Sequence, residues 1–148
     1  MSLESKIAND LKEAMKNKDQ ATLRSVRAIK AAILLFKTDG SGNELNDDSE
    51  IKLLQKLVKQ RQDSLDIYVK QGREDLAATE REEIAVIQRY LPAQLSPEEL
   101  RTAIQAIIAE TGVTSAKEMG KVISLANQRL AGKTEGKLIA STVKDLLN

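Results

Sequence analysis

Apolar residues recur along this chain three and four positions apart, which is the period of an amphipathic helix that buries one face. Ser2 precedes the first series and Asp19 precedes the second, and both are residue types that cap helix N-termini. The two series are Leu3, Ile7, Leu11 and Met15, and then Val26, Ile29, Ile33 and Phe36. The pattern predicts two consecutive helices, followed by a turn-rich loop over residues 38–46 that contains Gly40 and Gly42.

A long third helix and a fourth helix are expected next. Asp47, with Glu50 three residues later, marks the start of the third helix, which we expect to run to Gln71 and to stop at Gly72. The fourth is predicted over residues 73–91, because a proline at position 92 disfavours helical backbone in the residue before it.

A second group of helices is predicted after residues 92–96, which we take as a boundary. Ser96 begins a strong helix start, with proline at the first helical position and glutamate three residues after the cap. Ser115, with Glu118 three residues later, is expected to cap another helix. The three helices of this group are predicted over residues 97–111, 116–130 and 136–147.

No run of residues alternates polar and apolar over the length of a strand, so we expect no sheet. The sequence therefore predicts an all-α fold, with an N-terminal four-helix region over residues 1–93 and a C-terminal three-helix unit over residues 94–148.

The chain contains no Cys and no His. Their absence excludes thiolate zinc sites, Cys nucleophiles, Ser-His-Asp triads and the commonest general base at neutral pH. Glu80, Glu82 and Glu83 could in principle form a carboxylate pair or a Mg²⁺ site, but the sequence supplies no second cluster of ligands. We expect no metal, no cofactor and no catalytic residue, and leave open whether the chain is an enzyme.

Charge and hydropathy indicate a cytoplasmic monomer outside the membrane. No apolar run approaches the ~20 residues that span a bilayer, the N-terminus lacks a signal-peptide segment, and no surplus apolar stripe is evident.

The net charge of +1 hides an asymmetry. Residues 1–37 carry eight basic against four acidic side chains, residues 38–114 nine against fifteen, and residues 115–148 six against three. Basic ends favour a partner with phosphates or carboxylates.

The triplet Gly132-Lys133-Thr134 resembles the end of a phosphate-binding Walker A loop. The full motif needs a glycine five residues before Gly132, where this chain has Asn127, and a strand where this chain predicts a helix, so we exclude nucleotide hydrolysis. A weaker possibility is an anion site at the start of the last helix, near Gly136. Four cations could gather there: Lys121, Arg129, Lys133 and Lys137. Alternatively, the two glycines only make a turn and the lysines are solvated.

Two further residues depart from their helical surroundings. Arg61 falls within the apolar stripe of the third helix, and a buried guanidinium needs a carboxylate, which Glu80, Glu82 or Glu83 could supply. We expect either an interhelical ion pair or the floor of a groove that binds an acidic partner. Gly120 lies inside a predicted helix, where it costs about 1 kcal/mol relative to alanine. We expect close helix packing, or less readily a ligand, to compensate.

Several segments, in order and along essentially the whole chain, resemble the GatB/YqeY family and its free-standing YqeY-like members. The segments are residues 59–64 (KQRQDS), 72–76 (GREDL), 90–96 (YLPAQLS), 119–122 (MGKV) and 132–137 (GKTEGK). The C-terminal part alone resembles the tail domain of the B subunit of the tRNA-dependent amidotransferase. In the last segment, Thr134 and Glu135 stand where the family tends to have Ala-Asp.

The resemblance implies an all-helical two-part fold and the family label of carbon–nitrogen ligase activity with glutamine as amido-N-donor. It also implies tRNA contact, since the tail domain contacts tRNA while glutamine hydrolysis and phosphoryl activation belong to other parts of the enzyme. The first hypothesis is therefore a tRNA-associated accessory module without its own catalytic centre. Its contacts would be Lys121, Arg129, Gly132, Lys133, Gly136 and Lys137. The alternative is a protein-interaction adaptor that docks on an amidotransferase or another translation factor. A third hypothesis, an autonomous amidotransferase or hydrolase, finds no support in the residues.

Overall fold

The computed structural model describes residues 2–40 and 44–148, and within them every regular element is a helix. The all-α prediction is confirmed. The chain divides into two compact units, residues 1–91 (unit 1) and residues 92–148 (unit 2). The expected turn at Gly42 lies outside the described residues.

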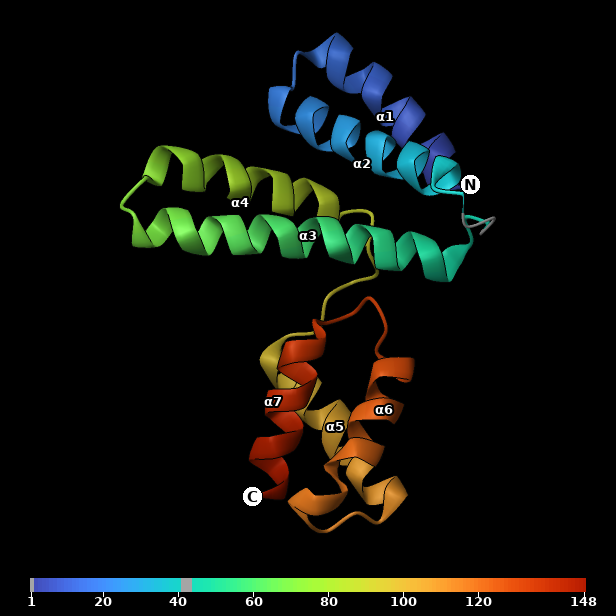
Figure 1. Ribbon diagram of the computed structural model, residues 1–148, viewed down its shortest axis with the longest axis vertical. Helices are drawn as coiled ribbons and strands as arrows, with labels where there is room; N and C mark the ends of the chain where they lie inside the picture. The colour runs from blue at the N-terminus through green and yellow to red at the C-terminus, as the bar shows by residue number, and fades with distance from the viewer. Residues whose placement is uncertain (1, 41–43) are drawn as a thin grey trace. The chain divides into compact units, whose positions relative to one another are not determined.

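Unit 1 is built from two helical hairpins (Figure 1). The helices are α1 (Leu3–Asn17), α2 (Gln20–Thr38), α3 (Asp47–Lys70) and α4 (Glu74–Gln88). Helix α1 packs against α2, α3 packs against α4, and α2 also packs against α4, which joins the hairpins.

Local capping chemistry sets the starts of these helices. The Ser2 hydroxyl accepts a hydrogen bond from the Ser5 N–H at 3.2 Å, and an Asp19 oxygen accepts one from the Thr22 N–H at 3.1 Å, so both predicted caps are confirmed. Helix α3 begins at Asp47, as predicted, but the predicted capping pair of Asp47 and Glu50 is wrong by one residue. Asn46 is the cap and forms a reciprocal capping box with Ser49, because its side-chain oxygen reaches the Ser49 N–H.

Helix α3 ends at Lys70, one residue before the predicted end, and Gly72 follows with φ +70. Helix α4 ends at Gln88, three residues earlier than predicted, because the N–H groups of residues 89–91 bond three residues back in tight turns. The proline at position 92 disfavours helical backbone at Leu91, and the tighter turns end the helix before that point.

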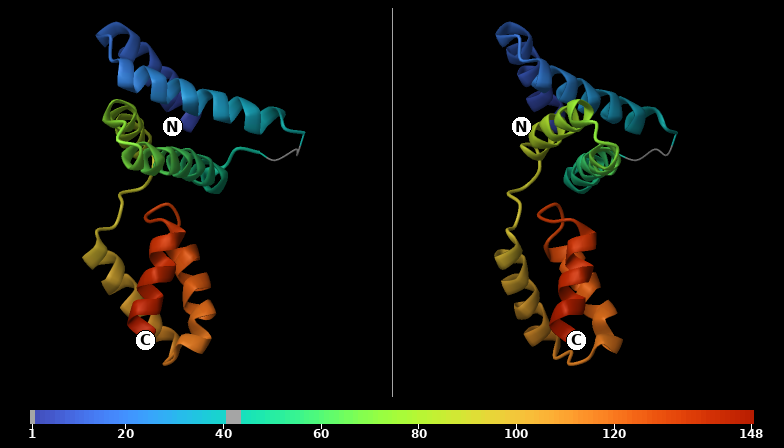
Figure 2. Two further views of the ribbon diagram at one scale, coloured as in Figure 1. Left: turned by 60° about the vertical axis from the view of Figure 1, so that its left-hand side comes forward. Right: turned by 90° about the vertical axis from the view of Figure 1, so that its left-hand side faces the viewer.

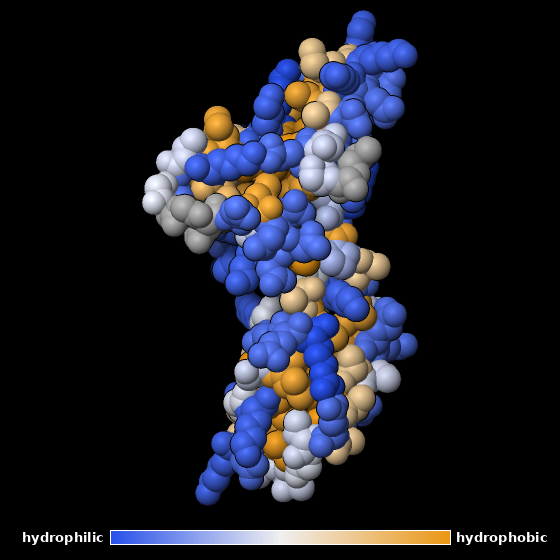
Figure 3. All heavy atoms as spheres, turned by 90° about the vertical axis from the view of Figure 1, so that its right-hand side faces the viewer, coloured by the Kyte–Doolittle hydropathy of each residue, from blue (hydrophilic) through white to orange (hydrophobic). Residues whose placement is uncertain are grey.

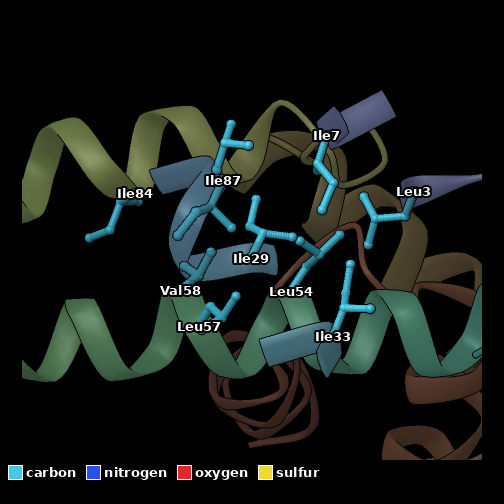
Figure 4. Close-up of a cluster of buried hydrophobic side chains, with 10 residues drawn as sticks. Leu3, Ile7, Ile29, Ile33, Leu54, Leu57, Val58, Ile84 and Ile87 are labelled. Atoms are coloured by element: carbon cyan, nitrogen blue, oxygen red, sulfur yellow. The ribbon is translucent and has the colours of Figure 1, made fainter. Parts of the chain in front are cut away.

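The core of unit 1 is aliphatic and draws on all four helices. Figure 4 shows Leu3 and Ile7 from α1 pointing toward Ile29 and Ile33 of α2 and toward side chains of α3 and α4. Ile29 has no exposed surface. A fully buried side chain of this size stabilises the fold by roughly 1.5–3 kcal/mol. The buried members of the core are Leu3, Ile7, Val26, Ile29, Ile33, Leu54, Leu57, Val58, Ile84 and Ile87.

Unit 2 contains three α-helices and one short 3₁₀ turn (Figure 2). The elements are α5 (Pro97–Thr111), η1 (Ala116–Glu118), α6 (Met119–Arg129) and α7 (Gly136–Leu147). Ser96 and Glu99 form the predicted capping box of α5. The continuous helix predicted over residues 116–130 is wrong, since its first turn is 3₁₀ and the Ser115 side chain makes no capping hydrogen bond.

The three α-helices of unit 2 enclose a second aliphatic core, separate from that of unit 1. Its buried members are Leu100, Ile104, Ile107, Val113, Val122, Ala126, Leu130, Ile139 and Val143. Each unit therefore has its own source of stability.

Candidate functional site

The loop between α6 and α7 is fixed by hydrogen bonds to the segment that precedes α5. The Leu95 N–H donates to the Lys133 carbonyl at 2.9 Å, and the Gln94 side-chain amide donates to the Gly132 carbonyl at 2.7 Å. Gly132 is buried and has φ +78, a backbone conformation in which side chains with a Cβ are strained. Thr134 is also buried, with 6% of its surface exposed. The loop backbone is therefore tied to the segment before α5 at Gly132 and Lys133.

Two lysines project from this fixed loop and from the helix that follows it. Lys133 and Lys137 are exposed, and neither forms an ion pair within the described residues. Helix α7 begins at Gly136 after Glu135, whose side chain makes no capping hydrogen bond. Backbone N–H groups at an uncapped helix N-terminus attract anions, and two nearby ammonium groups strengthen that attraction.

The structure does not bring all four predicted cations to this loop. Arg129 lies at the end of α6 beside the loop, but it donates hydrogen bonds to both carboxylate oxygens of Glu110. These bonds hold the pKa of the Glu110 carboxyl below its usual range. Lys121 lies in the first turn of α6, eight residues from Arg129 and so about 12 Å away along the axis. Among the described residues, Lys133 and Lys137 are the cations at the loop that form no ion pair.

Gly120 does not have the role expected from the sequence. It is exposed in the first turn of α6, and a Cβ built on it would meet nothing within 4 Å. The predicted close helix packing is wrong. The helix does not extend through residues 116–118, so Gly120 lies at a helix end rather than in its interior.

Arg61 forms the interhelical pair that its place in the apolar stripe predicts. Its Nε lies 3.5 Å from the Glu83 Oε1, and the two side chains are only 16% and 14% exposed. One Nη donates to the Leu57 carbonyl at 3.2 Å, whereas Nε is buried without a hydrogen bond in good geometry. The alternative expectation was that Arg61 forms the floor of a groove that binds an acidic partner. It does not fit, because the Arg61 side chain is enclosed.

The remaining acidic residues near Arg61 have different surroundings. Burial raises the pKa of the half-buried Glu80, and the charge of Glu83 raises it further, while Arg61 lowers it. Glu82 is exposed and pairs instead with Arg24 of α2 at 2.8 Å. The cluster therefore joins α3 and α4 through Arg61 and Glu83.

A groove that sequence reasoning missed runs between α2 and α3. It measures about 770 Å³ and is lined mainly by apolar side chains (Figure 3 shows apolar, orange surface among the polar residues of unit 1). The sequence signal was the cluster Ala28, Ala31 and Ala32, small residues on a second face of α2. The lining residues are Ala28, Ala31, Ala32, Leu35, Phe36, Asp39, Ser49, Lys52, Leu53, Lys56, Leu57 and Gln60.

A second, polar pocket of about 500 Å³ lies where α1 and the start of α2 meet the end of α4. The Tyr90 hydroxyl donates a hydrogen bond to Asp10 there. Burial, and then that hydrogen bond, raise the pKa of Tyr90. The lining includes both signs of charge, from Lys6, Arg89, Asp10 and Glu13, which gives no single ligand class a clear preference.

Two negative findings apply to the described residues. Within residues 2–40 and 44–148, no three acidic side chains are grouped to hold a metal ion. None of the described helices combines the length and the apolar composition needed to cross a membrane.

Comparison with known proteins gives a family match over nearly the whole chain. A family model described as "Yqey-like protein" matches residues 4–147. The relatives include "Altered inheritance of mitochondria protein 41, mitochondrial" from Vanderwaltozyma polyspora, 32% identical over 104 residues, covering 69% of this chain and 56% of the relative. The protein of the same name from Kluyveromyces lactis is 29% identical over 138 residues, covering 93% of this chain and 72% of the relative. The chain spans about half the length of several of these relatives.

The comparisons contradict the cytoplasmic location expected from the sequence, because these relatives are named as mitochondrial proteins. The expectation rested on the lack of a membrane-spanning run and of a secretory signal peptide. Neither feature distinguishes the cytoplasm from an organelle interior.

Proposed function

The chain belongs to the YqeY-like family, and from that premise we propose that it is a tRNA-associated accessory module without a catalytic centre of its own. One observation carries the proposal. Lys133 and Lys137 are exposed and unpaired within the described residues, on a loop whose backbone is fixed by Gln94 and Leu95. Ammonium groups carried on a fixed backbone beside an uncapped helix N-terminus suit the phosphates of a folded RNA.

The expected mode of recognition is by backbone and shape rather than by base sequence. Unit 2 contains no aromatic residue, so it offers no aromatic ring on which an unpaired base could stack. Gly132, at φ +78, lets the backbone follow the turn that presents the lysines, while Gly136 is the first residue of α7 and has no positive φ. Arg129 takes a secondary role because its guanidinium is hydrogen-bonded to Glu110. Lys121 also takes a secondary role, because the length of α6 separates it from the loop.

The test is fluorescence anisotropy of the purified chain with labelled deacylated tRNA at low and moderate salt. Two phosphate contacts predict a loss of affinity of about tenfold between 50 and 200 mM salt. Lys133→Glu/Lys137→Glu should abolish most of the binding. The matched control is Lys52→Glu/Lys56→Glu, which makes the same change of net charge in unit 1 and should retain tRNA binding.

Loss of binding in both variants alike would mean that net charge, and not the loop, attracts the RNA. An affinity for tRNA that does not change with salt concentration would also refute the proposal. Because the relatives are named for mitochondria, mitochondrial tRNA is a second probe beside bulk tRNA.

A second candidate is a protein-interaction adaptor that docks on an amidotransferase or another translation protein. The groove between α2 and α3 favours it, since a large, mainly apolar groove is unusual on the surface of an isolated domain. A partner that stays bound to the chain after nuclease treatment would support this candidate over the tRNA module.

A further inference from the structure

We propose that the groove between α2 and α3 is the docking site for an amphipathic helix of a partner protein that carries carboxylates beside its apolar stripe. The inference gives the adaptor candidate a surface and a partner chemistry. It does not depend on tRNA binding, which is assigned to unit 2.

The floor of the groove has the form that a helix face needs. On α2, the apolar lining residues Ala28, Ala31, Ala32, Leu35 and Phe36 recur at helical spacing and form one stripe. The three alanines are short, so the space above them is left open. Leu53 and Leu57 of α3 close the other side. A groove of this kind accepts side chains of a guest helix at positions three and four apart.

The apolar lining is incompletely covered by the residues that the structure describes. Leu35 is 69% exposed although it lies in the groove lining, while Leu57 at its base is only 9% exposed. An exposed leucine alone is ordinary on a protein surface. Leu35 instead continues an apolar stripe in a groove of about 770 Å³, which is the pattern of an interaction site.

The charge on the rim selects among possible occupants. Lys52 and Lys56 lie one turn apart on α3, both are exposed, and neither forms an ion pair within the described residues. Asp39 is an acidic residue at the lining. A partner helix with glutamates one turn apart would place both carboxylates opposite the lysines while its apolar stripe covers the alanines and Leu35. Two lysines beside an apolar floor favour such a helix over a nucleic acid backbone.

The probe for the test is a synthetic helical peptide. It carries leucines three and four positions apart and glutamates on both sides of that stripe, and a second peptide carries lysines in place of the glutamates. Binding of the fluorescently labelled peptides to the full chain is measured by anisotropy. The protein variants are Leu35→Glu and Lys52→Glu/Lys56→Glu. The control is Leu34→Glu, which changes the neighbouring leucine, 62% exposed and outside the groove lining.

The wild-type chain should bind the glutamate peptide and discriminate against the lysine peptide. Lys52→Glu/Lys56→Glu should lower the affinity for the glutamate peptide by about tenfold, because two attractions become two repulsions. The same variant should raise the affinity for the lysine peptide, because two repulsions become two attractions. Leu35→Glu should abolish binding of both peptides, and Leu34→Glu should leave it unchanged. Circular dichroism of each variant establishes that the helices are intact.

Equal binding of the two peptides, or equal effects of Leu34→Glu and Leu35→Glu, would overturn the proposal. Sedimentation equilibrium of the wild-type chain tests a further result that would contradict the proposal. A dimer that Leu35→Glu dissociates would assign the groove to a second copy of this chain. The tRNA assay separates the two proposals, since Lys133→Glu/Lys137→Glu should bind the glutamate peptide normally.

Discussion

Removing the Arg61–Glu83 pair should destabilise unit 1 more than removing the shorter Arg24–Glu82 pair. The N–O distance is 3.5 Å in the first pair and 2.8 Å in the second, so distance alone favours the second. Exposure points the other way, because the side chains of the first pair are 16% and 14% exposed and those of the second 41% and 55%.

The magnitudes decide in favour of the enclosed pair. Two unit charges 3.5 Å apart attract by about 5 kcal/mol at an effective dielectric constant of about 20. Incomplete desolvation and the imperfect geometry at Nε offset much of this, so we expect a coupling energy of about 1.5–3 kcal/mol. The exposed pair is screened by water and orders two long side chains, which limits its coupling to roughly 0.2–1 kcal/mol.

The assay is a pair of double-mutant cycles in urea. One cycle uses Arg61→Ala, Glu83→Ala and the double variant, and the other uses Arg24→Ala, Glu82→Ala and the double variant. Both tyrosines of the chain lie in unit 1 and the chain has no Trp, so near-ultraviolet and fluorescence signals report the unfolding of unit 1. Far-ultraviolet circular dichroism follows both units together.

A second substitution checks the physical reason for the result. Arg61→Met/Glu83→Leu replaces the pair with apolar side chains and should recover most of the stability lost in Arg61→Ala, because no uncompensated charge remains near the core. A coupling energy for Arg61–Glu83 at or below that for Arg24–Glu82 would refute the reasoning that enclosure outweighs distance here.

Three further outcomes are expected. Burial raises the pKa of Glu80, so its ionisation weakens the folded state as pH rises through and above the usual glutamate range. Glu80→Gln should therefore raise the urea midpoint at pH 7 and not at pH 4. The pKa of Tyr90 is also raised, so stability should fall as pH rises past ~10, where an unfolded tyrosine ionises, and Tyr90→Phe should reduce this loss in an alkaline melting series. Gly120→Ala should stabilise unit 2 by up to about 1 kcal/mol, whereas Gly132→Ala, at φ +78, should destabilise it by about 1–2 kcal/mol in thermal melts.

Much of the fold was predictable because its signals are local. Ser2, Asp19 and Ser96 each accept a hydrogen bond from an N–H three residues later, which a reader of the sequence can anticipate from residue type and spacing. The failures are also local in origin. The 3₁₀ turn before Met119 and the cap at Asn46 depend on small differences in backbone geometry that residue types alone do not determine.

The candidate site was less predictable, because it depends on how helices face one another. The sequence grouped Lys121 with Lys133 and Lys137 through their proximity in the chain, but α6 places Lys121 in its first turn, far from the loop at its other end. The sequence did not predict the hydrogen bonds between Arg129 and Glu110, since the two residues lie on different helices. Long-range pairings of exposed side chains leave no periodic signal.

Arg61 and Leu35 illustrate two opposite departures from a simple amphipathic helix. Arg61 puts a charge in an apolar stripe, and Glu83 of the same chain forms an ion pair with it. Helix α2 instead carries apolar residues on two faces. One face, which includes Ile29, is buried in the core, and the other, which includes Leu35, is exposed. A helix that is apolar on two faces needs cover on both. The core covers one face. The second face contradicts the expectation that the chain carries no surplus apolar stripe, and it is the reason to look for a helix from another protein.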